Sequence, residues 1–325
     1  MDIPHSDRYQ LQDPKFLYFY KAYGLYFSTD KPINVLADIL PTPPKTDIEF
    51  WFTSLPPFDL STMEWFPHSN FKRHLPRPNG DDPAHYFQSA DQQYIQIRYR
   101  DGVVFVLNAV GTRVWVVETA GYSFEYIVSY VLGTVLSFLL ALQKKVFLHA
   151  SAVAVDDRAV LFCAPSGFGK STTALYFAAQ GHAVLSDDIS LLEVRENRVY
   201  VTPAYPHLRL WNTNIVEREI ASQPLAPDWE KQFVDLNHQG FEFHEDRLPL
   251  GAIYLISGIA PVPEIYRLDG KMALMRLMDN TFMAPIASSD LRAAEFALFS
   301  VLIQSVAVSE LKRSHGFDKL AAVYD

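Results

Sequence analysis

The feature that most constrains this chain is one run, residues 159–173, with the sequence AVLFCAPSGFGKSTT. It places a short apolar strand and a turn with two glycines directly before the pair Lys170-Ser171 and a helix-forming stretch. This is the layout of a phosphate-binding P-loop, whose small residues let backbone N–H groups face phosphate oxygens at a helix N-terminus. Ala164 stands where the motif usually has its first glycine, which adds only a methyl group. The run therefore predicts a site for nucleotide phosphates.

The residues of this loop have separate expected roles. We expect Lys170 to reach the outer phosphates and to assist catalysis, and the Ser171 hydroxyl to bind Mg²⁺, which takes oxygen ligands. The residues predicted to hold the nucleotide are Pro165, Ser166, Gly167, Phe168, Gly169, Lys170, Ser171 and Thr172. A chance Gly-Lys-Ser turn is the alternative. The strand before the loop and the helix after it disfavour that alternative, because they are the context the motif requires.

The segments on both sides of the loop carry further polar residues in a recognisable order. His149 opens the strand before the loop, and Gly181-His182 and then Asp187-Asp188 follow the helix. In order and spacing, this run resembles the catalytic domain of HPr kinase/phosphorylase, a bacterial serine kinase similar in fold to ATP-dependent phosphoenolpyruvate carboxykinase. The close resemblance covers about residues 148–190.

The resemblance implies an α/β (α+β) fold, with a P-loop kinase domain over residues 146–325 that uses ATP and Mg²⁺. It implies that Asp188 accepts the proton of the attacking hydroxyl and that His149 belongs to the active site. Asp187 would help Ser171 to hold the metal. As a lone histidine, His149 could instead be structural, but its spacing to the loop favours a functional role. If the strand continued through both aspartates, only one of them could face the phosphate.

Other parts of the chain depart from the HPr kinase pattern. Residues 203–211 contain no acidic residue where that family carries a glutamate metal ligand. The catalytic arginine of the family is matched by Arg247, with Arg209 as a competitor. The N-terminal half does not resemble HPr kinase, so HPr is not the expected substrate. The layout is more similar to kinases of ribosomally made peptides, such as lasso-peptide kinases, which phosphorylate a serine of a precursor peptide.

Composition bounds the class of protein. The chain has 325 residues, 49% hydrophobic and 20% charged, with a net charge of −9, which suits a soluble protein of about two domains. The acidic balance argues against a nucleic-acid-binding protein. Cys163 is the single cysteine and excludes a disulfide framework within the chain. The polar N-terminal residues lack the pattern of a signal peptide, so we expect a cytoplasmic protein.

Residues 1–145 predict a β-rich, aromatic N-terminal domain that ends in a buried helix. Short β-branched and aromatic runs alternate with Pro and Gly turn signals, and Asp101-Gly102 indicates a hairpin. The predicted strands begin at Tyr23, Asp47, Tyr94, Val103 and Val114. Residues 126–142 are almost continuously apolar, but a membrane span needs about 20 such residues. We therefore expect a helix buried between the two domains, with a membrane span as the alternative.

The elements after the P-loop are less distinctive. Residues 189–202 predict a hairpin that turns at Glu196-Asn197, and 203–211 an extended segment that presents Tyr205, His207 and Arg209 beside the phosphate site. An ordinary surface loop is the alternative for that segment. Residues 212–246 are polar and irregular and predict a mobile loop or short helices near the acceptor site. A strand is expected over 250–256 and a packed helix over 291–308.

Together these features predict a kinase that transfers the γ-phosphoryl group of ATP to a hydroxyl, most often serine, of a peptide or protein. The alternatives are a small-molecule hydroxyl kinase and a non-catalytic nucleotide-binding regulatory protein. Retention of Lys170, Asp188 and His149 favours an enzyme, since a sensor needs no base. The expected partners are a nucleotide and a peptide, without nucleic acid or membrane, and a homo-oligomer remains open.

Overall fold

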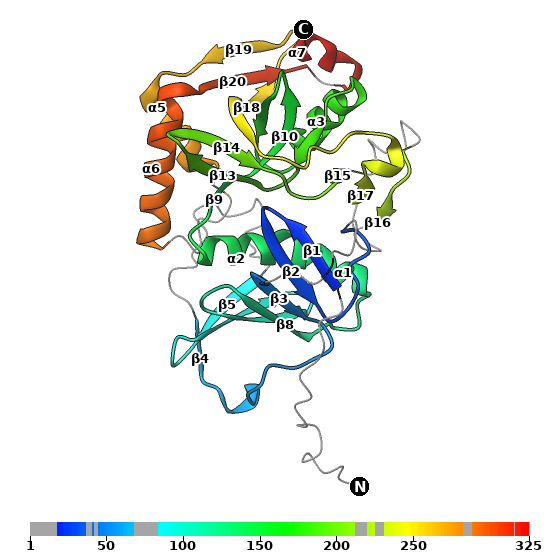
Figure 1. The fold of residues 1–325 in the computed structure, drawn as a ribbon, viewed down its shortest axis with the longest axis vertical. Coiled ribbons are helices and arrows are strands. Elements are labelled where there is room, and N and C mark those ends of the chain that lie inside the picture. Colours follow the sequence, from blue (N-terminus) through cyan, green and yellow to red (C-terminus); the bar gives the residue numbers. More distant parts are fainter. Residues whose placement is uncertain are drawn as a thin grey trace.

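The computed structural model describes residues 18–36, 41, 45–67, 84–211, 220–224, 231–281, 288–314 and 316–324. The fold is mixed α/β, with one large sheet in each half of the chain and a long apolar helix between the two sheets (Figure 1). The helix and both sheets form the framework on which the site is built.

The N-terminal half forms an eight-stranded sheet in the order β1-β2-β3-β8-β7-β6-β5-β4. Its pairs are antiparallel except β2–β3 and β3–β8, which are parallel. The strands are β1 (Tyr18–Ala22), β2 (Leu25–Thr29), β3 (Ile48–Trp51), β4 (Trp65–Pro67), β5 (Ala84–Ser89), β6 (Tyr94–Tyr99), β7 (Val104–Asn108) and β8 (Arg113–Glu118), and a 3₁₀ turn, η2, covers Leu60–Thr62.

The predicted hairpin at Asp101-Gly102 is confirmed, and Gly102 has a φ of +94°. The predicted strand start at Tyr23 is wrong by two residues. Tyr23 and Gly24 both have positive φ and form the tight turn between β1 and β2. The alternating pattern finds the strands, but it does not distinguish an aromatic turn residue from a strand residue.

A continuous helix links the two halves. It comprises α1 (Phe124–Tyr130), a π-helical turn η3 (Val131–Val135) and α2 (Leu136–Leu142), and it begins at Ser123, whose side chain accepts from the Tyr126 amide. Among the described helices it alone is long and apolar enough to cross a membrane, and 78% of its most apolar window is buried inside the protein. The prediction of a buried helix over residues 126–142 is confirmed.

This helix shares one apolar core with both halves of the chain. The core contains Ile97 and Phe105 of the first sheet together with Leu191 and Tyr205 of the C-terminal half. Burial of such side chains stabilises the folded state by roughly 25 cal/mol per Å² of apolar surface. The packing of the helix therefore holds the N-terminal sheet against the elements that carry the predicted site.

The C-terminal half is built on a nine-stranded sheet in the order β12-β10-β11-β18-β14-β13-β9, with β20 paired to β18 and β19 to β20. The β11–β18 and β18–β20 pairs are parallel. The strands are β9 (Val146–Leu148), β10 (Ala150–Val155), β11 (Arg158–Cys163), β12 (Val184–Ser186), β13 (Ser190–Arg195), β14 (Arg198–Thr202), β18 (Leu248–Ile259), β19 (Glu264–Arg267) and β20 (Ala307–Arg313).

A three-stranded sheet in the order β15-β17-β16 lies beside this one, made of β15 (His207–Trp211), β16 (Gln223–Pro224) and β17 (Lys231–Asp235). The helices are α3 (Lys170–Ala179), α5 (Gly270–Asp279), α6 (Ser289–Ser305) and α7 (Ala321–Tyr324), with 3₁₀ turns η4 (Asn237–Gln239) and η6 (Asp318–Leu320). Figure 1 shows α3 against one part of the large sheet and α5 and α6 at its far edge.

Most predicted elements of this half are confirmed. Strands β13 and β14 form the expected hairpin, and Glu196 and Asn197 have φ of +49° and +60° at its turn. The strand expected over 250–256 is the longer β18, and the helix expected over 291–308 is α6, after which the chain enters β20. The expectation of an irregular region over 212–246 is wrong for residues 231–235, which form β17, while 212–219 and 225–230 lie outside the described residues.

Candidate active site

The loop between β11 and α3 has the backbone shape that its sequence predicts. Gly167 and Gly169 both have a φ of +90°, a left-handed conformation that favours glycine, and Gly169 immediately precedes α3. Ala164 is not among the described residues with positive φ, so alanine is tolerated there without backbone strain. The N-terminus of α3 thus opens beside a glycine turn, which is a favourable place for an anion.

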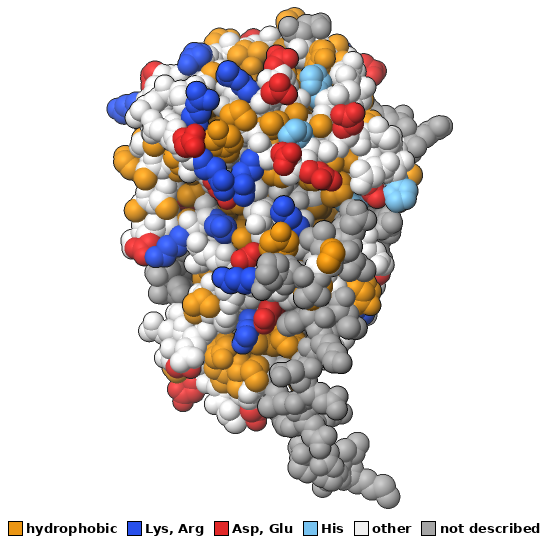
Figure 2. All heavy atoms as spheres, viewed as in Figure 1, with side chains coloured by type: hydrophobic (Ala, Val, Ile, Leu, Met, Phe, Trp, Pro, Cys, Tyr) orange, Lys and Arg blue, Asp and Glu red, His pale blue; other side chains and the backbone are white. Residues whose placement is uncertain are grey.

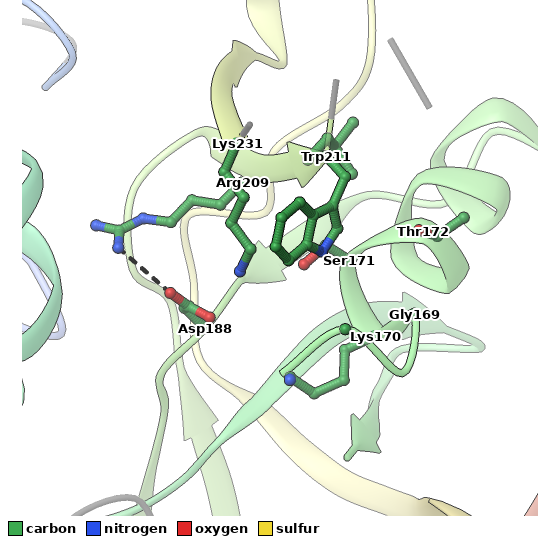
Figure 3. A pocket seen from close by; sticks show the side chains of 10 residues that line it. Gly169, Lys170, Ser171, Thr172, Asp188, Arg209, Trp211 and Lys231 are labelled. Atoms are coloured by element: carbon green, nitrogen blue, oxygen red, sulfur yellow. Dashed lines mark hydrogen bonds and ion pairs between the residues drawn. The ribbon is translucent and has the colours of Figure 1, made fainter. Parts of the chain in front are cut away.

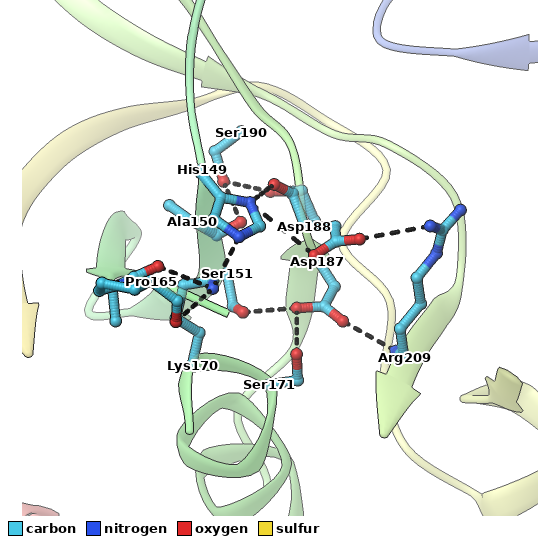
Figure 4. Close-up of polar contacts among 12 residues, drawn as sticks. His149, Ala150, Ser151, Pro165, Lys170, Ser171, Asp187, Asp188, Ser190 and Arg209 are labelled. Atoms are coloured by element: carbon cyan, nitrogen blue, oxygen red, sulfur yellow. Dashed lines mark hydrogen bonds and ion pairs between the residues drawn. The ribbon is translucent and has the colours of Figure 1, made fainter. Parts of the chain in front are cut away.

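Lys170 is buried at the start of α3 and its ammonium is held by the chain itself. Its Nζ lies 2.8 Å from the Ala164 carbonyl oxygen and 2.9 Å from His149 Nε2 (Figure 4). His149 Nδ1 lies 2.8 Å from the Asp188 carbonyl oxygen. Because a carbonyl only accepts, Nδ1 carries the hydrogen and Nε2 accepts from the lysine.

The protonation state of His149 agrees with this geometry. Burial, and after it the neighbouring Lys170 ammonium, lower the pKa of His149 to about 4. Burial also lowers the pKa of Lys170, which Asp188 and Asp187 partly oppose. At neutral pH a neutral imidazole therefore orients the lysine by hydrogen bonding.

The two aspartates lie just past the end of β12, and both face the site. Asp187 Oδ1 accepts hydrogen bonds from Ser151 (2.5 Å) and Ser171 (2.9 Å), and its Oδ2 accepts from the Arg209 amide (2.8 Å). Asp188 has a φ of +67°, which breaks the alternation of a strand. The pair therefore lies in a turn, where two adjacent carboxylates can reach the same site.

The carboxylates differ in electrostatic environment. Burial, and then the charge of Asp188, raise the pKa of Asp187. Burial also opposes ionisation of Asp188, but Arg209 and then His149 hold the pKa of that carboxyl well below its usual range. Arg209 Nη1 donates to Asp188 Oδ2 at 3.3 Å. Asp188 is thus ionised at neutral pH and accompanied by a cation.

The donor set at Ser171 and Asp187 fits a magnesium ion. Both supply hard oxygen atoms, 2.9 Å apart, at the start of the helix that the loop precedes. In the described parts of the chain no group of three or more His, Cys, Asp or Glu side chains could hold a metal alone. Magnesium at nucleotide sites commonly uses one or two protein ligands and completes its shell with phosphate oxygens and water.

Lys170, Ser171, Asp188 and Arg209 open onto one pocket, shown in Figure 3. It is lined by Gly167, Gly169, Lys170, Ser171, Thr172, Asp188, Arg209, Leu210, Trp211 and Lys231. Three of these side chains are cations and one is an anion, so the lining suits an anionic ligand. Of the other residues predicted to hold the nucleotide, Pro165, Ser166 and Phe168 are exposed on the loop outside this lining.

The structure distinguishes between Arg209 and Arg247, the two candidates for the catalytic arginine. Arg209 is buried, contacts Asp188 and donates to the Tyr205 hydroxyl at 3.3 Å. Arg247 instead pairs with Glu193 (3.2 Å) and donates to Thr202 (3.3 Å). The assignment of Arg247 to the site is therefore corrected, because this side chain is held on the β13–β14 hairpin. Figure 2 shows basic side chains gathered over these strands.

The other predicted site residues also differ in whether they lie at the pocket. Of the segment 203–211, Arg209 lines the pocket, whereas Tyr205 lies behind it and accepts from Arg209, and His207 packs edge-on against Phe233. His182, part of the Gly-His turn, contacts the Ala154 carbonyl and the Tyr324 hydroxyl. That histidine joins α7 to the sheet, away from the pocket.

Sequence reasoning missed three residues that the fold brings to the site. Trp211 and Lys231 line the pocket from β15 and β17, and Gly133 of the π-helical turn lies against the Arg209 guanidinium. A Cβ on Gly133 would lie 2.8 Å from Arg209 Nη1. No local motif marks these positions. The only signal was the short β-branched and aromatic stretch after Lys231, inside an otherwise polar region.

Comparisons with known proteins show a distant similarity to solved structures. No family model matches the chain, and no curated protein matches it. Among solved structures, the chain is similar to the Hpr(Ser) kinase/phosphatase from Coxiella burnetii, with 12% sequence identity and a TM-score of 0.32. The match covers 55% of this chain and 93% of that one. A similarity at this level transfers no function to the chain.

Proposed function

We propose that the protein is a magnesium-dependent kinase that transfers the γ-phosphoryl group of ATP to a serine hydroxyl of a peptide. One observation carries the proposal. A buried lysine at a glycine turn, a serine and an ionised aspartate with its arginine all line a single pocket, and Asp187 lies directly behind that serine, 2.9 Å from its hydroxyl. Phosphoryl transfer asks a protein mainly for such positioning and charge neutralisation.

The chain's own residues divide this work. The amides at the start of α3 and the Lys170 ammonium would bind the phosphates, with His149 fixing the direction of the lysine. Ser171 and Asp187 would hold Mg²⁺, which when bound would neutralise phosphate charge. Asp188 would accept the proton of the attacking hydroxyl, and Arg209 keeps this carboxylate ionised. His149, being neutral, supplies no charge of its own.

The acceptor class rests on the resemblance of residues 148–190 to HPr kinase and of the general layout to peptide kinases. The pocket is compatible with a peptide, because Trp211 in its lining is an exposed apolar side chain. A peptide serine is therefore the acceptor to test first, and small-molecule hydroxyls form the comparison set.

The test uses terminally labelled ATP, Mg²⁺ and a library of serine-containing peptides. We expect label transfer by the wild-type chain and its loss in Lys170→Ala. Removing this charge-assisted contact should cost about 1.5 to 3 kcal/mol and weaken ATP binding roughly ten- to a hundredfold. Lys271→Ala, at an exposed lysine of α5, is the matched control. Unchanged calorimetric affinity for ATP in Lys170→Ala would refute the phosphate-loop assignment, and transfer only to small hydroxyl compounds would refute the peptide acceptor.

A further inference from the structure

Lys231 lines the pocket, and the proposed reaction gives it no role so far. It is the first residue of β17 and pairs in register with Trp211, the last residue of β15. Both line the pocket together with Lys170 and Asp188. In Figure 3 the Lys231 side chain extends from the small sheet toward Asp188, on the side of the pocket opposite Lys170. The fold thus brings a second lysine to the site from a segment 61 positions further along the chain.

The contacts of Lys231 leave its charge available. Its Nζ lies over the Trp211 ring, 5.4 Å from the ring centre. Arg209, the cation that β15 contributes to the pocket, donates hydrogen bonds to Asp188 and Tyr205. Within the described part of the chain, no carboxylate forms an ion pair with Lys231. A partly buried ammonium that rests on an aromatic ring and has no ion-pair partner among the described residues is suited to bind an anion.

The position of Lys231 indicates which phosphate of a bound nucleotide this lysine would contact. Its charge acts on Asp188, the proposed base, as well as on Lys170. A group near Asp188 lies where the acceptor hydroxyl must meet the transferred phosphoryl group, at the outer end of the nucleotide. The charged side chains that β15 and β17 add to the pocket lining are both cations, Arg209 and Lys231.

We propose that Lys231, steadied by Trp211, binds the outermost phosphate of the nucleotide from the wall opposite Lys170. This inference rests on the proposed function and assigns the pocket a preference for nucleoside triphosphates over diphosphates. Lys170 and Lys231 then hold the transferred group between two cations. Trp211 acts as a positioning residue, because it limits where the Lys231 ammonium can lie.

The test is calorimetric titration of ATP and of ADP, each with Mg²⁺, into the full-length chain. We expect Lys231→Ala to weaken ATP binding at least tenfold and to change ADP binding less than twofold. Lys231→Arg should restore most of the preference, since it keeps the charge. Trp211→Phe should keep the preference because a ring remains, whereas Trp211→Ala should reduce it. Lys271→Ala again serves as the control, and thermal melting establishes that each variant is folded.

The outcomes separate this inference from the function on which it rests. Equal losses for ATP and ADP in Lys231→Ala, or no loss for either, overturn the role of Lys231. If Lys170→Ala still weakens ATP binding about tenfold or more in that case, the proposed function stands alone. If the wild-type chain binds neither ATP nor ADP, both the role of Lys231 and the proposed kinase function are refuted. Loss of the triphosphate preference in Lys231→Ala with rescue by Lys231→Arg supports the inference.

Discussion

At the scale of single residues, the site depends on buried groups whose charges are set by their neighbours. Lys170 keeps its place through the Ala164 carbonyl and a neutral His149, and Asp188 keeps its charge through Arg209. Truncating one partner of such a buried pair leaves the other unpaired, which costs more than the pair contributes to stability. His149 and Arg209 are therefore needed even though neither has to contact the reacting atoms.

Two buried histidines should make the protein sensitive to acid. Burial lowers the pKa of both His149 and His207 to about 4, from an ordinary value of 6.5. The unfolded chain therefore binds these protons more readily, so stability is intact above pH 6.5 and falls as pH drops toward 4. The loss is at most about 3 kcal/mol for each histidine.

We predict that His207→Phe will remove about half of this loss, since a phenyl ring keeps the contact with Phe233 and has no proton to bind. The measurement is the free energy of unfolding in denaturant at several pH values from 7 to 4. His85→Phe, at an exposed histidine of β5, should leave the pH dependence unchanged. The same slope in wild type and His207→Phe would contradict the assignment.

The sequence predicted the residues of the site that lie in one continuous stretch. The loop, Lys170 and the Asp187-Asp188 turn are local patterns, so spacing was enough to place them. Arg209 and Arg247 could not be ranked, because the choice depends on which strand faces the pocket. Lys231 is brought to the site by pairing between β15 and β17, and strand pairing across 20 residues leaves no local pattern.

At the scale of elements, the buried helix acts on the site through its π-helical turn. Such turns replace regular α-helical bonding locally and often occur at functional positions. Here Gly133 lets the helix approach the guanidinium of Arg209, which in turn contacts Asp188. The sequence predicted the helix from its apolar length. It could not predict the π turn, which lies where the helix approaches Arg209, a residue far away in the chain.

We predict that Gly133→Ala will slow phosphoryl transfer about 10- to 100-fold, because a Cβ there must displace Arg209 from Asp188. The substitution favours the helix by up to about 1 kcal/mol, so a folded protein is expected. Ser137→Ala is the control, since that hydroxyl bonds only within its own helix, to the Thr134 carbonyl. Single-turnover rates and ATP affinity should be measured together. Normal transfer in a folded Gly133→Ala variant would exclude positioning of Arg209 by the helix.

At the scale of the whole molecule, the apolar core passes from the first sheet through the helix into the C-terminal half. The sequence suggested two domains with a boundary near residue 145, because composition changes there. Contacts such as those of Leu191 and Tyr205 with the helix cluster cross that position. The sequence predicted a helix buried between two domains, but composition does not report which surfaces pack together, so the single core shared by both halves could not be predicted.

The burial of the helix leads to a prediction about the whole protein. With 78% of its apolar window inside the fold, the helix has little surface left for lipid. We predict that the protein will stay in the supernatant after ultracentrifugation of a detergent-free lysate, because this helix is packed inside the fold. Recovery in the membrane pellet, released only by detergent, would contradict this placement of the helix.

The central claim, that Asp188 is the base of a phosphoryl-transfer site, is tested most directly by single-turnover transfer from labelled ATP in Asp188→Asn. The substitution keeps the shape of the side chain and removes its capacity to accept a proton. We predict that transfer will fall by at least about 10²-fold while ATP affinity stays within a few-fold of wild type. Asp187→Asn, the adjacent control, should instead raise the Mg²⁺ concentration needed for transfer. Transfer at the wild-type rate by Asp188→Asn, or loss of ATP binding in it, would contradict the claim.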